Sequence, residues 1–205
     1  MKKTLLLFSF YFLVFSFPAI AQETQLSRLE RHVYTLAADS LRGRQAGLND
    51  DARAYIAREW QGMGLKAFWG DSLEVPFDIW KQQLFCNLVA IIEGSDPVLK
   101  DEYIVIGGHY DHLGMKEGVV YNGADDNASG SACVTEVARQ LLARQKELKR
   151  SVIVCAFDAE EIGLYGSEAV AKRMENEGII GRVKLMLSVD MVGWLKAGGA
   201  LTLDS

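Results

Sequence analysis

The chain has 205 residues, of which 49% are apolar, enough for one domain of ordinary size around a substantial core. Its formal net charge is −5 at pH 7, and a mildly acidic chain is a poor candidate for binding nucleic acid. Cys86, Cys133 and Cys155 lie in apolar surroundings without a Cys-X-X-Cys pair, so we expect buried free thiols rather than a disulfide or zinc ligands.

The first 21 residues have the pattern of a secretory signal peptide. Two lysines precede an apolar run at residues 5–17, and alanines stand at the −3 and −1 positions of a cleavage site before Gln22. The run is about 13 residues long, whereas a membrane span needs about 20. We therefore expect a signal peptide at 1–21, a domain at 22–205 with charge −7, a periplasmic or extracellular location and no stable membrane anchor.

Downstream of this segment, apolar spacing predicts helices that alternate with strands. Helices are expected at 24–41, from Asp50 or Asp51 to about Gly62, at 128–144 and at 163–177. Strands are expected at 73–80, 85–92, 103–106, 152–157 and 185–189, with one more beginning at 200–203. Pro76 assigns the first of these strands to an edge of the sheet. This alternation predicts an α/β fold, a three-layer sandwich with a mixed, centrally parallel sheet.

Acidic and imidazole side chains follow the ends of several predicted strands. They are His109 in GGHYDH, Asp126 in NGADDNASG, Glu160 and Glu161 in CAFDAEEIG, and Asp190 in LSVDMVG. Because ligands of open α/β sheets bind at the carboxyl ends of strands, we expect these side chains to converge. Several carboxylates with one imidazole indicate a divalent metal site, for which zinc is the best candidate.

The two ends of the HYDH segment have different expected orientations. In an extended segment His109 and Asp111 point to the same face, so Asp111 can orient a metal-bound imidazole. His112 would face away from His109 if the strand continued. A lone histidine on such a strand has a second interpretation, that of a core side chain with its hydrogen bonds satisfied.

Each acidic segment also has a structural alternative. Asp125 and Asp126 precede a predicted helix and could cap it, although a carboxylate at this point can also bridge two metal ions. Of Glu160 and Glu161, one can bind metal while the other faces the water and moves its proton, or both can belong to a solvated loop. Asp190 ends an apolar run, where a carboxylate is costly unless it is paired or metal-bound.

The blocks GGHYDHLG, NGADDNASG, DAEEIG and SVDMVG, in this order, resemble the secreted zinc aminopeptidases of the M28 metallopeptidase family. The upstream LRGRQAG and GMGL segments are also similar, so the resemblance covers roughly residues 26–195. It implies zinc-peptidase roles for six residues: His109 and Asp190 for one zinc ion, Asp126 as the bridge, Glu161 for the other ion, Glu160 as general base, and Asp111 as support. It further implies a cis peptide between Asp126 and Asn127.

The chain departs from the family pattern at one ligand. The family takes its final zinc ligand from a histidine well downstream of the SVDMVG block, and no histidine follows His112 here. His32 lies in the first predicted helix, where a surface or packing role is expected. Because the sequence also stops inside an apparent strand, we expect a domain incomplete at its C-terminus, with an incomplete Glu161 metal site.

The resemblance implies an exported two-zinc aminopeptidase that removes N-terminal residues from peptides by metal-activated water. One alternative is a single-zinc glutaminyl cyclase, which shares much of the metal shell. A carboxypeptidase of related fold and an inactive binding domain of the same fold are the others.

Overall fold

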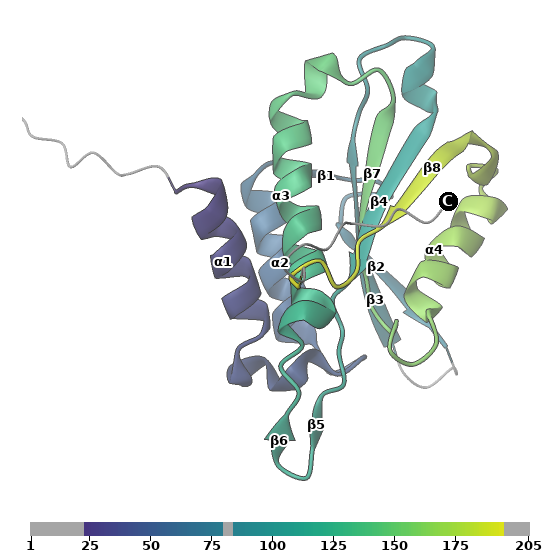
Figure 1. Cartoon of the computed structure of the whole chain (residues 1–205). Helices are drawn as coiled ribbons and strands as arrows, with labels where there is room; N and C mark the ends of the chain where they lie inside the picture. Colours follow the sequence, from purple (N-terminus) through teal and green to yellow (C-terminus); the bar gives the residue numbers. More distant parts are fainter. Residues whose placement is uncertain (1–22, 80–83, 195–205) are drawn as a thin grey trace, which may run out of the picture.

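The computed structural model describes residues 23–79 and 84–194, in which a six-stranded sheet lies between two helical layers (Figure 1). Three helices cover one face of the sheet, α1 (Gln25–Leu36), α2 (Asp50–Gly62) and α3 (Gly130–Ala143). The helix α4 (Tyr165–Asn176) covers the other face. The predicted three-layer sandwich is confirmed.

The sheet is mixed, with parallel pairing on both sides of β4. Its strands are β1 (Lys66–Ala67), β2 (Glu74–Asp78), β3 (Leu84–Ile92), β4 (Tyr103–His109), β7 (Ser151–Phe157) and β8 (Val183–Ser188). They lie in the order β1-β3-β7-β4-β8, with β2 paired to β3. Strand β4 runs parallel to β7 and β8, whereas β3 is antiparallel to β1, β2 and β7. The carboxyl ends of β4, β7 and β8 therefore meet at one edge.

Strand β7 shows why a continuous apolar run forms this sheet. Its alternate residues contribute to two different cores, one under α1–α3 and the other under α4. Val152, Val154 and Ala156 pack in the first core, and Ile153, Cys155 and Phe157 pack in the second with Val170 and Met174 of α4. Every residue of β7 is buried, as expected for a strand covered on both faces.

Most predicted elements are present with shifted ends. The first helix ends at Leu36, and a 3-10 turn (Asp39–Arg44) replaces its expected last residues. The residue preceding α2 is Asn49 rather than an aspartate, and its side chain donates to Asp158 instead of capping the helix. Strand β2 pairs with β3 alone among the described strands, which confirms the edge position expected from Pro76.

Two features of the fold were not predicted. A short hairpin of β5 (Met115–Lys116) and β6 (Val119–Val120) turns through Glu117 and Gly118, both at positive φ. The apolar run at 185–189 is typical of a buried strand, but residues 184–188 of β8 are exposed. Within the described ranges β4 is the only strand that pairs with β8, so its other edge is uncovered.

The remaining sequence expectations have mixed outcomes. Cys86 and Cys155 are buried free thiols as expected, whereas the free thiol Cys133 is only partly buried. His32 is buried against Tyr55, whose hydroxyl lies 2.7 Å from its Nδ1, so it has the packing role.

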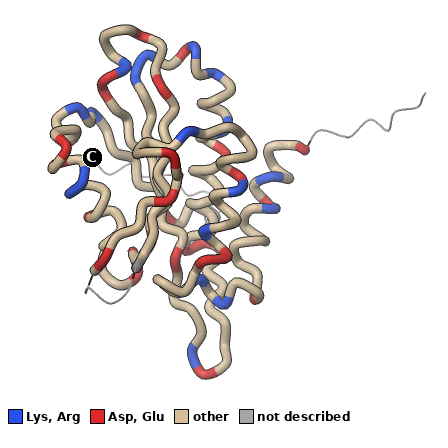
Figure 2. The backbone as a smooth tube through the Cα atoms, turned by 180° about the vertical axis from the view of Figure 1, so that it is seen from behind, with Lys and Arg blue, Asp and Glu red and all other residues tan. Residues whose placement is uncertain are grey.

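Some expectations lie outside the described residues, namely the signal peptide at 1–21, the strand beginning at 200–203 and the end of the strand at residue 80. None of the helices in the described ranges combines the length and apolar content that a bilayer span requires. Lysines and arginines are spread over several separate segments of the chain rather than gathered in one (Figure 2).

A buried ion pair fastens α1 to α3. Arg28 donates through Nη2 and Nε to the two carboxylate oxygens of Glu136, at 2.6 and 2.9 Å. The Glu136 side chain is only 3% exposed, so water screens this pair weakly. The hydrogen bonds from Arg28 hold the pKa of Glu136 below its usual value of 4.5.

Glu136→Gln tests the contribution of the Arg28–Glu136 ion pair to stability. At neutral pH we expect the free energy of unfolding to fall by about 2 kcal/mol, because hydrogen bonds to a charged acceptor are replaced by weaker ones. A carboxyl whose pKa is lowered by folding stabilises above its unfolded pKa, and this stabilisation disappears as the pH falls through its folded pKa. The difference between wild type and variant should therefore shrink below pH 4.5, as measured by urea denaturation across the acid range.

Glu147→Gln is the matched control. Glu147 also pairs with an arginine, Arg144 at 2.6 Å, but both side chains are largely exposed. We expect a much smaller change in unfolding free energy at every pH. Equal effects of the two substitutions would contradict a special role for the Arg28–Glu136 pair.

Candidate metal centre

His109 is the last residue of β4, and its ring lies beside Asp111. The imidazole is buried, with Nδ1 3.2 Å from the backbone carbonyl of Asp111 and 3.6 Å from its Oδ1. The two side chains therefore share one face, as the extended spacing predicted. This contact leaves Nε2 of His109 free to face the other clustered residues.

The Asp111 carboxylate joins the end of β4 to the turn that follows β7. It is completely buried, and its two oxygens accept the backbone N–H groups of Glu160 at 3.1 Å and Glu161 at 3.2 Å. A buried carboxylate needs such donors to offset its lost hydration. The same contacts fix the backbone of the two glutamates next to His109.

Asn127 similarly fixes the segments that carry Asp126 and Asp190 next to each other. The peptide between Asp126 and Asn127 is cis, which confirms the expectation drawn from the family resemblance. The Asn127 side chain donates to the carbonyl of Val189 at 2.9 Å and accepts the N–H of Met191 at 3.3 Å. The segment that carries Asp190 is thereby held against the turn that carries Asp126.

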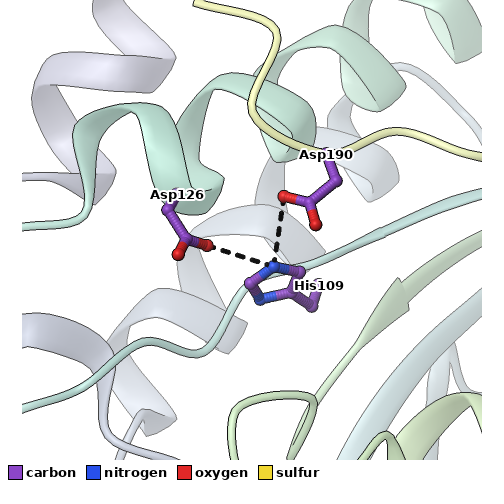
Figure 3. Close-up of side chains that lie close together, drawn as sticks. All are labelled: His109, Asp126 and Asp190. Atoms are coloured by element: carbon purple, nitrogen blue, oxygen red, sulfur yellow. Dashed lines mark ion pairs between the residues drawn. The ribbon is translucent and has the colours of Figure 1, made fainter.

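The first cluster consists of His109, Asp126 and Asp190 (Figure 3). Nε2 of His109 lies 3.3 Å from Asp126 Oδ1 and 3.5 Å from Asp190 Oδ1. In a tetrahedral zinc site with bonds of about 2.0–2.1 Å, neighbouring ligand atoms lie about 3.3 Å apart. The donor types and their spacing fit a zinc ion.

A second cluster lies on the other side of Asp126 and consists of Asp126, Glu161 and His112. Nδ1 of His112 lies 2.6 Å from Glu161 Oε1 and 3.9 Å from Asp126 Oδ2. His112 was expected to face away from His109 only if the strand continued; β4 ends at His109, so the alternation stops there and His112 faces the second cluster.

Glu160 faces the first cluster without belonging to it, since its Oε2 lies 3.8 Å from His109 Nε2. Partial burial raises the pKa of the Glu160 carboxyl, which suits a group that takes up and releases a proton. Burial alone would lower the pKa of His109, but the hydrogen bond to Asp111 and the charges of Glu160 and Asp190 outweigh it and raise this pKa to about 9. The cluster therefore stabilises positive charge.

Asp125 does not cap the following helix, which was the structural alternative for this pair of acids, but its side chain does have a structural role. Its Oδ1 accepts the N–H of Gly193 at 2.8 Å and the Ser129 hydroxyl at 3.2 Å. Asp125 thus belongs to neither cluster and connects its turn to the segment after Asp190.

Arg44, from the LRGRQAG loop, binds backbone carbonyls of the segments that carry the clustered residues. Its completely buried guanidinium donates to the carbonyls of Tyr110 at 2.8 Å, Asn122 at 2.7 Å and Gly123 at 2.9 Å, and also to that of Leu36. Burial lowers its pKa to about 10, which leaves it charged at neutral pH. One side chain therefore holds both the HYDH segment and the turn that leads to Asp126.

Comparison with known proteins gives one family. The model of peptidase family M28 matches residues 87–201. A probable leucine aminopeptidase of Arthroderma otae is 34% identical over 119 residues, which are 55% of this chain and 30% of that protein. A probable zinc metalloprotease of Pyrenophora tritici-repentis is 31% identical over 186 residues, 84% of this chain and 40% of that protein. The chain spans less than half the length of these curated relatives.

Two solved structures share the fold. The LapA aminopeptidase of Legionella pneumophila has a TM-score of 0.63 at 24% identity, covering 84% of this chain and 44% of that one. An Acidobacteriales bacterium glutaminyl cyclase has a TM-score of 0.62 at 19% identity, covering 84% of this chain and 60% of that one.

Arg44→Lys tests how much the hydrogen bonds from Arg44 to these backbone carbonyls contribute to stability. A lysine keeps the charge but cannot reach several carbonyls with a rigid fork of donors, so we expect a loss of about 3 kcal/mol in unfolding free energy. Arg42→Lys is the control, because Arg42 lies in the same loop with an exposed side chain. Chemical denaturation of both variants measures the effect, and equal stabilities would refute it.

Proposed function

The chain belongs to peptidase family M28, and from this premise we propose that the full-length protein is an exported two-zinc aminopeptidase acting on peptides. The observation that carries the proposal is the position of Asp126 between the two clusters. Its Oδ1 lies 3.3 Å from His109 Nε2, and its Oδ2 faces His112 Nδ1 at 3.9 Å. A carboxylate that offers one oxygen to each side is suited to bridge two metal ions.

The proposed ligands follow from the two clusters. His109, Asp126 and Asp190 would hold one zinc ion, and Asp126 with Glu161 would hold the other. When bound, the ions would act as Lewis acids that polarise a peptide carbonyl and lower the pKa of water. Asp111 would act as a positioning residue, since it touches His109 and the backbone of Glu161 rather than the substrate.

Glu160 is the proposed general base. Its carboxylate lies beside the first cluster and is only partly buried, so it can reach both a water molecule and a bound substrate. It would take a proton from water and deliver it to the nitrogen of the leaving amine. A pKa raised toward neutrality improves this second step, because the protonated acid then forms more readily.

The acidic surroundings also favour a substrate with a free amino terminus. The side chains of Asp126 and Asp190 are 36% and 50% exposed, so they present negative charge to the solvent. A terminal ammonium group would be attracted to such a site. The relative from Arthroderma otae is named a probable leucine aminopeptidase, which agrees with this substrate class.

The single-zinc glutaminyl cyclase is the alternative, and the fold likeness alone does not separate the two reactions. Two measurements on the full-length protein do so. The proposed function requires two zinc ions per chain and release of nitroaniline from aminoacyl-nitroanilides. One zinc ion with cyclisation of N-terminal glutamine would favour the cyclase, and neither activity would favour an inactive binding domain.

Glu160→Gln tests the catalytic assignment. Loss of a positioned general base is expected to lower kcat by about 10²- to 10⁴-fold in the nitroanilide assay. Zinc content, measured by mass spectrometry, should stay unchanged because Glu160 is not a proposed ligand. Glu175→Gln, at an exposed position on α4, is the matched control and should leave both quantities unchanged. Full activity of the Glu160 variant would overturn the assignment.

We further propose that residues 1–21 direct export to the periplasm or the cell exterior and are then removed. The support is the basic start, the apolar run and the alanines before Gln22. N-terminal sequencing of the protein secreted from its native start should give Gln22 as the first residue. An intact N-terminus on membrane-bound protein would instead indicate an anchor.

A further inference from the structure

The β5–β6 hairpin begins and ends at the candidate metal centre. It lies between His112, which belongs to the second cluster, and Gly123, where a Cβ atom would lie 2.5 Å from His112 Cδ2. The chain thus leaves the second cluster, forms the hairpin and returns to the same imidazole ring. Figure 1 shows the hairpin projecting from the rest of the domain. Its side chains are therefore close to the centre without being part of it.

The base of the hairpin is fastened to the loop that contains Arg44. The N–H of Gly114 donates to the carbonyl of Gly43 at 2.9 Å, and the N–H of Tyr121 donates to the carbonyl of Gly114 at 3.0 Å. Gly43 has a φ of +68°, and a Cβ atom there would overlap the carbonyl oxygens of Gly114 and Tyr121. Because a two-stranded hairpin is only marginally stable alone, these contacts determine where it lies. The hairpin thus holds its side chains at a defined position.

Apolar side chains of the hairpin are exposed on both of its faces. The register pairs Met115 with Val120 and Lys116 with Val119, so the two pairs lie on opposite faces. Met115 is 46% exposed and Val119 is 60% exposed. Tyr121 shares the face of Val119, and its ring centre lies 5.4 Å from the Lys116 ammonium. Apolar side chains that are exposed together, rather than singly, indicate a binding surface.

The length of the hairpin decides which part of a bound peptide it can meet. Residues 113–117 lead to its tip, and an extended strand rises about 3.3 Å per residue, so the hairpin reaches at most about 16 Å from the second cluster. An extended peptide advances by about the same distance per residue. A peptide whose first residue lies at the clusters therefore has about four or five residues within this range.

A second copy of this chain is the competing occupant of the hairpin surface. A stable interface buries about 800 Å² and about 20–30 residues on each partner. The two strands and their turn comprise only residues 115–120, so they could supply only a small part of such an interface. A bound peptide needs far fewer contacts, and the centre to which both ends of the hairpin return would hold its first residue.

We propose that the β5–β6 hairpin is a substrate-binding element that contacts peptide residues on the carboxyl side of the cleaved bond, mainly through Met115, Val119 and Tyr121. This inference rests on the proposed aminopeptidase function, because the first residue of the peptide is then held at the clusters and the remainder extends away from them. The preferred substrates are peptides of about four residues or more with apolar side chains after the first residue, rather than dipeptides.

The double substitution Met115→Ser with Val119→Ser tests this role in the full-length protein. For a hexapeptide with apolar residues at its second to fifth positions, we expect KM to rise about 10-fold at unchanged kcat, because binding contacts away from the reacting atoms are lost. Leucyl-nitroanilide has a single residue and is too short to reach the hairpin. Its KM and kcat should stay at the wild-type values, which also shows that the variant folds.

Val98→Ser is the matched control. Val98 is 76% exposed and precedes the amino end of β4, whereas the hairpin follows the carboxyl end of that strand. This substitution removes a comparable apolar surface and should change neither substrate's kinetics. Light scattering of the wild type and both variants measures the molar mass in parallel, because a hairpin that binds a second copy would alter it.

Each outcome decides the role of the hairpin. A higher KM for the hexapeptide alone, seen in the double variant and not in the control, would establish it as a substrate-binding element. An unchanged hexapeptide KM, an equal loss with both substrates, or a change in molar mass without a change in KM would overturn the proposal and leave the aminopeptidase function standing. A wild-type protein that hydrolyses neither substrate would overturn both proposals.

Discussion

The buried carboxylate of Asp111 is the contact on which the candidate centre depends. It lies 3.6 Å from the His109 ring and accepts the backbone N–H groups of Glu160 and Glu161, so residues about 50 positions apart are fixed together. Because the carboxylate is fully buried, losing either donor would leave one of its oxygens without that hydrogen bond in the interior. The ends of β4 and β7 are thereby joined by hydrogen bonds to a side chain as well as by the backbone hydrogen bonds of the sheet.

The neutral side chain of Asn127 fixes the segment that carries Asp190 in a similar way. Asn127 bonds the backbone on both sides of Asp190, through Val189 and Met191. Its own backbone follows the cis peptide that begins at Asp126. The segments that carry Glu161 and Asp190 are thus positioned by Asp111 and Asn127, which belong to neither cluster.

Much of this arrangement could be predicted from sequence. The apolar run of β7 implied a strand covered on both faces, and the polar residues after strand ends implied a site at the sheet edge. The exposure of β8 and the orientation of His112 could not be predicted. Exposure depends on which elements cover a strand, and alternation gives a side chain's direction only while the strand continues.

The sequence by itself determined the fold class, the family and the segments that supply His109, Asp126, Glu161 and Asp190, because these follow from periodicity, local motif and residue chemistry. Only the tertiary structure decided that His112 turns toward Glu161 and Asp126. Its backbone is held by Arg44, a residue 68 positions earlier, whose guanidinium satisfies carbonyls from three other segments. Contacts between residues so far apart in the sequence leave no periodic pattern in it, because they form only when the chain has folded.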